Sequence, residues 1–190
     1  MTNIWEKLYR EGMSAEYPNN ELMEQISGLK IKGKVLDLGC GVGANLGFLK
    51  KRGFKTYGID ISETACKKAK KRHDGEIICG NATKLPYSDN FFDLVTDVAC
   101  LYVLKRKDIL KAIKEVKRVL KPNGYFLSFM YFYGTKRVFA GTGHYYLLKK
   151  NEIKKIFKDF KIIQIKEITQ DYLLPKKKML CKSAIILCKA

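Results

Sequence analysis

Val35-Leu36-Asp37-Leu38-Gly39-Cys40-Gly41-Val42-Gly43 is the stretch that decides the fold class of this 190-residue chain. A short apolar run, typical of a buried strand, leads into three alternate glycines, and residues 44–51 then read as a helix. The glycines allow a tight turn and let backbone N–H groups approach a ligand at the helix N-terminus. The spacing Gly39, Gly41, Ala44 also fits the dinucleotide pattern GxGxxG/A, so the glycines alone do not choose a cofactor.

Strand and helix patterns alternate outward from this turn. Strands are expected over residues 34–38, 56–60, 76–79, 92–98, 125–132, 161–168 and 183–189, and helices over 44–51, 62–72, 108–120 and 151–160. Ser62, Asp108 and Asn151 are the expected N-caps. The alternation predicts an α/β fold with a doubly wound, Rossmann-like, mainly parallel sheet and helices on both faces. In such a sheet ligands bind beyond the carboxyl ends of the strands.

The composition is that of a globular protein. Apolar residues make up 46% and charged residues 29% of the chain, which excludes a disordered or collagen-like protein. No stretch offers the roughly 20 charge-free apolar residues of a membrane span, and the N-terminus lacks a signal-peptide core. The six cysteines form no CxxC pair, which argues against a disulfide framework or a zinc site and favours buried thiols. We therefore expect one soluble, cytoplasmic domain over residues 1–190, without a metal or a membrane partner.

The net charge of +18 gathers in the second half of the chain. Residues 101–190 contain 22 basic and six acidic residues. Such a surface could attract nucleic acid or an anionic membrane. Only six of the 37 basic residues are arginine, however, and base or phosphate recognition favours the bidentate arginine fork. We interpret the lysines as a solvated surface, so a nucleic-acid partner is possible but not favoured.

Two carboxylates narrow the choice of cofactor. Asp37 stands two residues before the first glycine, where it would repel a diphosphate and attract a cationic amine, directly or through water. Asp60 ends the second predicted strand, where an acidic side chain can accept both ribose hydroxyls. Adenosine with an ammonium group and no phosphate describes S-adenosyl-L-methionine. The structural alternatives are a loop-organising carboxylate for Asp37 and a helix-capping turn for Asp60.

The sequence also resembles the class I S-adenosylmethionine-dependent methyltransferase family, in its small-molecule type. Similar stretches occur in the family's order at residues 35–43, 57–62, 80–87, 91–95 and 115–124. The resemblance runs over roughly residues 33–132 and implies a seven-stranded sheet with one antiparallel strand near the C-terminus. It also implies S-adenosyl-L-homocysteine as the product. One departure is Asn81, at a position where the family more often has aspartate.

The resemblance implies roles for individual residues around the cofactor. Matched position by position, these are Asp37, Gly39, Gly41 and Gly43 at the methionine part, Asp60 at the ribose, Ile61 on the adenine, Asn81 and Ala82 at the adenine edge, and Asp97 and Val98 on the sulfonium side. In small-molecule members the N-terminal segment often caps the pocket. We therefore expect cap helices within residues 1–32, with Tyr9 or Tyr17 closing over the cofactor; ordinary helix packing is the alternative.

The acceptor is less constrained by the sequence. Residues 96–102 lack both the Asn/Asp-Pro-Pro-Tyr/Phe motif of amine-methylating nucleic-acid enzymes and the Pro-Cys of cytosine-ring enzymes. Many small-molecule relatives carry histidine where Tyr102 stands. Residues 131–148 hold six aromatic side chains and His144, and read either as a lid over the acceptor or as a buried flap. His73, at the end of a lysine-rich helix, is expected at the surface.

The candidate catalytic residues are therefore His144 and Tyr102. The favoured function is methyl transfer to a small-molecule acceptor. The alternatives are an RNA or protein methyltransferase that uses the basic C-terminal half, and a catalytically silent cofactor-binding partner protein. The sequence leaves the oligomeric state open.

Overall fold

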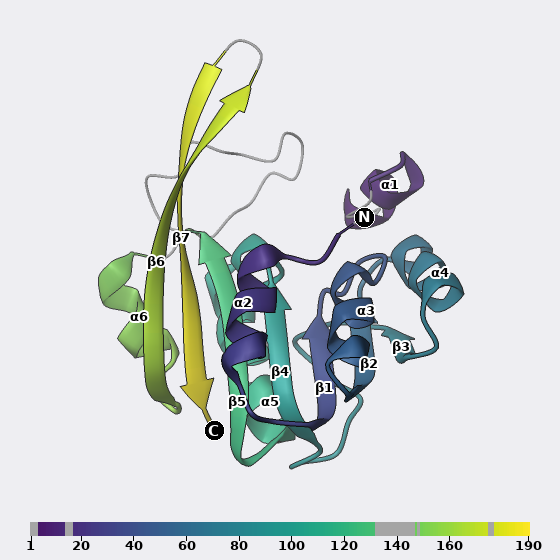
Figure 1. The fold of residues 1–190 in the computed structure, drawn as a ribbon, viewed down its shortest axis with the longest axis horizontal. Helices are drawn as coiled ribbons and strands as arrows, with labels where there is room; N and C mark the ends of the chain where they lie inside the picture. The colour runs from purple at the N-terminus through teal and green to yellow at the C-terminus, as the bar shows by residue number, and fades with distance from the viewer. Residues whose placement is uncertain (1–3, 14–16, 132–146, 148, 175–176) are drawn as a thin grey trace.

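The computed structural model describes residues 4–13, 17–131, 147, 149–174 and 177–190 (Figure 1). One sheet has the strand order β3-β2-β1-β4-β5-β7-β6. Its strands are β1 Gly33–Leu38, β2 Phe54–Asp60, β3 Glu76–Cys79, β4 Phe92–Val98, β5 Leu120–Tyr131, β6 Lys161–Leu174 and β7 Lys177–Lys189. The helices are α1 Ile4–Arg10, α2 Asn20–Gly28, α3 Ala44–Lys51, α4 Glu63–Arg72, the short 3-10 helix η1 Leu101–Val103, α5 Arg106–Val119 and α6 Lys150–Ile156.

The pairing of the strands confirms the predicted sheet. β1 pairs in parallel with β2 on one side and with β4 on the other. β7 lies antiparallel between β5 and β6. The chain winds outward from β1 in one direction and returns to β4 on its other side, so the strand order reverses between β1 and β4. A ligand site is expected in the crevice beyond the carboxyl ends of these two strands.

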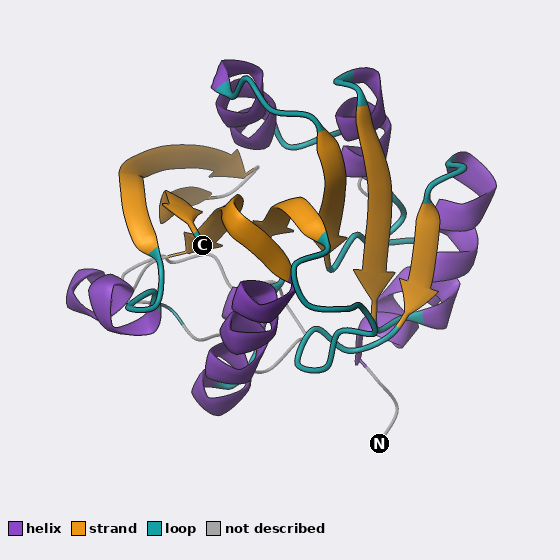
Figure 2. Cartoon of the chain, turned by 90° about the horizontal axis from the view of Figure 1, so that it is seen from below, coloured by secondary structure: helices purple, strands orange, loops and turns teal. Residues whose placement is uncertain are grey.

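Helices cover both faces of the sheet (Figure 2). Alternate residues of β1 point to opposite faces, as strand geometry requires. Val35 packs in a cluster with Leu22 and Ile26 of α2 and Leu49 of α3. Leu36 and Leu38 instead join a larger cluster with the buried faces of α5 and α6. β1 is therefore buried on both sides, which holds the glycine-rich turn that follows it in a fixed place.

Two predicted helix caps are wrong. The N-cap of α5 is Lys105, not Asp108, because Asp108 lies in the first turn, where its charge faces the positive end of the helix dipole. The N-cap of α6 is Lys149, not Asn151, because the Glu152 carboxylate accepts the Lys149 N–H at 3.0 Å. α6 also ends at Ile156 rather than at residue 160.

The C-terminal hairpin is longer than the sequence indicated. β6 runs to Leu174 and β7 begins at Lys177, so the two strands continue past the end of β5 (Figure 1). The apolar pattern predicted only the part that packs on the sheet, because the outer part is paired through its backbone. Most of the predicted aromatic segment 131–148 lies outside the described residues, namely residues 132–146 and residue 148. Among the described residues, no helix combines the length and the apolar character needed to cross a bilayer.

Candidate active site

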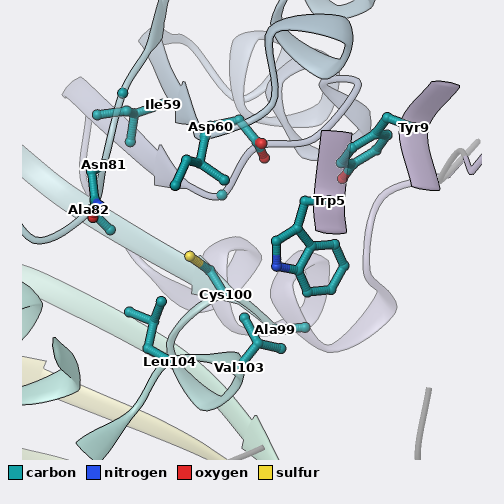
Figure 3. A pocket seen from close by; sticks show the side chains of 13 residues that line it. Trp5, Tyr9, Ile59, Asp60, Asn81, Ala82, Ala99, Cys100, Val103 and Leu104 are labelled. Atoms are coloured by element: carbon teal, nitrogen blue, oxygen red, sulfur yellow. The ribbon is translucent and has the colours of Figure 1, made fainter. Parts of the chain in front are cut away.

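A pocket opens at the carboxyl ends of the central strands, where the sheet topology places it (Figure 3). Six of the predicted site residues meet there although they come from distant parts of the chain. The described lining residues are Trp5, Tyr9, Gly39, Ile59, Asp60, Ile61, Gly80, Asn81, Ala82, Ala99, Cys100, Val103 and Leu104. None of these lining residues is a lysine, an arginine or a histidine. The pocket therefore suits a ligand without phosphate groups.

Asp60 joins the two turns that form the floor of the pocket. One carboxylate oxygen accepts the Gly41 N–H at 2.9 Å and the other accepts the Ser62 N–H at 2.9 Å. Burial raises the pKa of Asp60, and these backbone hydrogen bonds oppose that effect. The capping-turn alternative for Asp60 is thus present in the structure. It leaves ligand binding possible, because each carboxylate oxygen can accept a second hydrogen bond.

Asp37 lies deeper, between β1 and β4, and is 1% exposed. It accepts hydrogen bonds from the Thr96 hydroxyl at 2.8 Å and from the Asn45 side-chain amide at 3.3 Å. Burial raises its pKa to about 7, in spite of these two donors. Asp37 is not among the described residues that line the pocket, so its contact with a cofactor, direct or through water, stays a prediction.

The glycine-rich turn needs glycine at two points for reasons of space as well as conformation. Gly39 has φ +63°, and a Cβ there would lie 2.6 Å from the Cys100 Cβ. Gly41 has φ +55°, and a Cβ there would lie 2.6 Å from the Tyr9 hydroxyl oxygen. Any side chain at either position would push Cys100 or Tyr9 out of the pocket wall.

His73 differs from the prediction. Its ring packs over Gly43 and Gly47, and the side chain is half-buried rather than a surface residue. Burial, with the neighbouring Arg72 charge, lowers the pKa of His73. The two glycines leave the space that the imidazole fills, which the sequence pattern of a lysine-rich helix end did not reveal.

The loop after β3 supplies Asn81 and Ala82. The Asn81 side-chain oxygen accepts hydrogen bonds from the Thr83 N–H and the Thr83 hydroxyl, both at 2.9 Å. This is the turn geometry that aspartate also forms, so the loop conformation does not depend on the charge that the family pattern would supply. The departure at Asn81 therefore leaves the loop's shape unchanged.

The turn after β4 places other residues in the pocket than the ones expected. Asp97 is fully buried and accepts hydrogen bonds from the Ser128 hydroxyl at 2.6 Å and from the Cys100 and Leu101 N–H groups at 3.0 Å. Burial raises its pKa to about 6. Asp97 and Val98 lie beside a second, very small cavity with Phe129 rather than in the pocket wall. Their role on the sulfonium side stays a prediction.

Ala99 and Cys100 line the pocket in their place. Ala99 has φ +66°, which is unusual for alanine and marks a strained position of the kind that gathers at functional sites. The cysteine pattern predicts a buried thiol at Cys100, and the sequence offers no prediction for Val103 or Leu104. A useful signal was available for Ala99 and Cys100, because both directly follow a strand of the switch point, whereas Val103 and Leu104 reach the pocket through η1.

The remaining predicted residues lie away from the pocket or outside the described chain. Tyr102 is 2% exposed within the core, with its ring edge-to-face against Tyr131 at a centroid distance of 5.0 Å. Tyr17 is 85% exposed. His144 falls outside the described residues. A catalytic role for Tyr102 or His144 stays a prediction, as does a contact of Tyr17 with the cofactor.

The other cysteines largely occupy the positions that the composition predicted. Cys40, Cys66 and Cys188 are buried free thiols, whereas Cys79 is exposed. Within the part of the chain that the structure describes, no group of three or more histidine, cysteine or acidic side chains could hold a metal ion.

The sequence of this chain is similar to those of known methyltransferases. Residues 36–128 match the model of the family described as "Methyltransferase domain". A fatty-acid O-methyltransferase from Mycolicibacterium smegmatis is 38% identical over 104 residues, which are 51% of this chain and 37% of that protein. A demethylmenaquinone methyltransferase from Bacillus mycoides is 36% identical over 110 residues, 53% of this chain and 45% of that protein. The matched region spans less than half the length of these curated relatives.

The fold has counterparts among solved structures. A 1,6-didemethyltoxoflavin-N1-methyltransferase from Burkholderia thailandensis, solved with its acceptor and S-adenosylhomocysteine bound, superposes with a TM-score of 0.73 at 16% identity. The alignment covers 96% of this chain and 84% of that one. At this identity the superposition shows a shared Rossmann-like fold over nearly the whole chain.

Proposed function

We propose that this chain, whose residues 36–128 match the family model of a methyltransferase domain, is a class I S-adenosylmethionine-dependent methyltransferase that transfers a methyl group from S-adenosyl-L-methionine to a small-molecule acceptor and releases S-adenosyl-L-homocysteine. One observation carries the proposal. The described wall of the pocket at the switch point contains Asp60, with Asp37 buried behind the glycine-rich turn, and no cationic side chain. A ligand with a ribose and positive charge, and without phosphate, complements that arrangement.

The described pocket residues suit the adenosine part of the cofactor. Asp60 would accept the ribose hydroxyls, and Ile61, which is 47% exposed in the open pocket, would cover the adenine. Asn81 and Ala82 would border the adenine edge. Burial of an exposed isoleucine against an aromatic base gains apolar contact, so the exposure of Ile61 supports a flat apolar ligand there.

The chain's contribution to the reaction is mainly positioning. The bound cofactor supplies an electrophilic methyl group on a sulfonium. Asp60 and the Gly39–Gly41 turn would fix its orientation, and Trp5 and Tyr9 would exclude water from the pocket. Alignment of this kind can account for much of the rate of an in-line displacement. A general base is needed mainly for a poorly nucleophilic hydroxyl acceptor, and His144 is the proposed base for that case.

A small-molecule acceptor is supported by the apolar wall and by the relatives. Trp5, Ala99, Val103 and Leu104 give the pocket one apolar side that suits an enclosed molecule. The named relatives act on a fatty acid, on demethylmenaquinone and on 1,6-didemethyltoxoflavin. These names define three chemical classes to try: carboxylates with acyl chains, quinols and nitrogen heteroaromatics.

The test is release of S-adenosyl-L-homocysteine in the presence of each acceptor class, with transfer RNA and a basic peptide as further arms. We expect turnover with at least one small molecule and loss of that turnover in Asp60→Ala. Turnover confined to RNA, with binding that weakens steeply as salt increases, would favour the nucleic-acid alternative. Cofactor binding without turnover in any arm would favour a silent partner protein.

A further inference from the structure

Helix α1 covers the cofactor pocket without belonging to the core. Trp5 and Tyr9 extend from α1 into the pocket wall, opposite Cys100 and beside Asp60 (Figure 3). None of the described residues of α1 is fully buried. A seven-residue helix is also too short to be stable by itself in water. Specific contacts with the rest of the protein must therefore hold it in place.

Several of these contacts are made by Glu6. Its carboxylate accepts hydrogen bonds from the Thr64 hydroxyl at 2.6 Å, the Ser62 hydroxyl at 2.7 Å and the Thr64 N–H at 3.1 Å. The Arg10 guanidinium donates a fourth at 2.8 Å. We call Glu6, Ser62 and Thr64 the Glu6 latch. The side chain of Glu6 is only 15% exposed although it belongs to a surface helix.

The electrostatics of the latch keep it charged. The hydrogen bonds from Thr64 and Ser62 lower the pKa of Glu6 to about 2. Ser62 is the N-cap of α4 and Thr64 lies in its first turn, so the carboxylate also faces the positive end of that helix. A second tie runs the other way, from the Lys68 ammonium on α4 to the Tyr9 carbonyl at 2.6 Å.

The latch is directly connected to the cofactor site. The Ser62 hydroxyl donates a hydrogen bond to Glu6, and the Ser62 N–H donates one to Asp60. The Tyr9 hydroxyl, one helical turn beyond Trp5, lies over Gly41, whose N–H is bound by Asp60. Gly12, at φ +99°, follows α1 and supplies a backbone position at which the chain can turn.

We propose that Glu6 is a positioning residue. Its latch holds α1 closed over the bound cofactor and limits the rate at which S-adenosyl-L-homocysteine, the product, dissociates. The inference rests on the proposed function and deepens it. Trp5 and Tyr9 line one side of the pocket while α1 lies on α4, so a bound cofactor would leave faster once the latch hydrogen bonds break. Because α1 contributes no fully buried residue to the core, opening does not require the core to unfold.

The chain provides a matched set of variants. Glu6→Gln keeps the shape and removes the charge, and Thr64→Val removes one hydroxyl donor from the other side. Glu63→Gln is the control. This substitution also removes one carboxylate charge at the N-terminal end of α4, but the Glu63 side chain is 72% exposed and pairs with Lys67 at 3.9 Å instead of contacting α1 through the latch. Trp5 is the single tryptophan of the sequence, so its fluorescence reports directly on α1.

The measurements are acrylamide quenching of Trp5, the dissociation rate of S-adenosyl-L-homocysteine by stopped flow, and thermal unfolding. For Glu6→Gln we expect stronger quenching, dissociation faster by about tenfold, and a raised KM for the cofactor with a nearly unchanged melting temperature. Thr64→Val should increase the quenching and the dissociation rate as well, but by less than Glu6→Gln does. Glu63→Gln should behave like the unmodified protein. The double variant should dissociate no faster than Glu6→Gln, since both changes open one latch.

The two proposals fail in different ways. If the unmodified protein binds no S-adenosyl-L-homocysteine, the proposed function is contradicted. If it binds the product but Glu6→Gln gives the same quenching and dissociation rate as Glu63→Gln, the latch is overturned and the methyltransferase proposal stands. A large fall in melting temperature for Glu6→Gln would also overturn it, since Glu6 would then support the fold rather than the lid.

Discussion

The Asp37 carboxyl illustrates how one buried side chain can set the pH range of cofactor binding. Burial holds its pKa at about 7, compared with an ordinary value of 3.8, so below pH 7 the free protein holds a proton there. A cationic amine favours the ionised form, and binding below pH 7 must therefore expel that proton. We predict that cofactor affinity falls as the pH is lowered below about 7, by at most about tenfold per pH unit.

Calorimetry between about pH 5 and pH 8 tests this prediction. Asp37→Asn should bind weakly and with little dependence on pH in this range. The variant also distinguishes the pH effect of Asp37 from that of Asp97. Burial raises the pKa of Asp97 to about 6, and Asp97 can still ionise in Asp37→Asn. An affinity of the unmodified protein that is constant over the range would rule out Asp37 as a partner of the ammonium group.

Tyr87 gives a prediction about stability. Its hydroxyl is buried and has no hydrogen-bond partner among the described residues, while its ring packs edge-to-face on Tyr57 and Phe92. Tyr87→Phe removes an unsatisfied polar group and keeps the ring contacts. We expect the free energy of unfolding to rise by up to about 1 kcal/mol in urea titrations.

Tyr57 is the matched control for that change. It belongs to the same ring cluster, but its hydroxyl interacts with the Lys55 ammonium, an interaction that raises the pKa of Lys55. Tyr57→Phe should therefore leave stability unchanged or lower it slightly. Equal destabilisation by both substitutions would mean that the Tyr87 hydroxyl has a partner in solution.

At the scale of elements, α5 holds the loop that carries Asn81 to the pocket. The Glu115 carboxylate accepts the Leu85 N–H at 2.7 Å, and the Arg118 guanidinium donates to the Leu85 carbonyl at 3.0 Å and the Tyr87 carbonyl at 2.7 Å. Glu115 also pairs with Arg118 at 2.9 Å. One turn of α5 thus fixes the backbone of a loop that has no regular structure of its own.

We predict that Glu115→Ala destabilises the protein by about 1–3 kcal/mol, because it leaves the Leu85 N–H without its acceptor and removes one of the two carboxylates that pair with Arg118. Cofactor affinity should fall as well, since Asn81 and Ala82 lose their fixed backbone. Lys114→Ala, at an exposed position of the same helix, is the control. Urea midpoints and calorimetry on both variants measure the two effects, and a Glu115→Ala protein as stable as Lys114→Ala would contradict the assignment.

The elements also show where sequence reasoning succeeds. The strand that precedes the glycine-rich turn and the helix that follows it agree with prediction because apolar period and glycine position both constrain them locally. The caps at Asp108 and Asn151 were wrong because several polar residues near a helix start compete for the same role. The hairpin of β6 and β7 extends further than predicted because backbone pairing leaves little trace in side-chain pattern.

At the scale of the whole molecule, the site is assembled from segments that the sequence keeps far apart. Asp60 could be predicted because it ends a strand, and Ile61 and Asn81 because the family resemblance implies a place for them at the adenine. Trp5 reaches the pocket wall from a helix far in sequence from the glycine-rich turn. Its position depends on the latch between α1 and α4, which no local sequence pattern encodes. Cys100 reaches the pocket through the left-handed turn at Ala99, a conformation that the alanine itself does not suggest.

The central claim is that the acidic pocket at the switch point binds S-adenosyl-L-methionine, and calorimetry on the unmodified protein and on Asp60→Ala tests it most directly. We predict saturable binding of one cofactor per chain that weakens at least about a hundredfold in Asp60→Ala, as expected when a buried carboxylate that holds a ribose is removed. A folded, unmodified protein that binds neither S-adenosyl-L-methionine nor S-adenosyl-L-homocysteine, or an Asp60→Ala variant that binds as tightly as the original, would contradict the account.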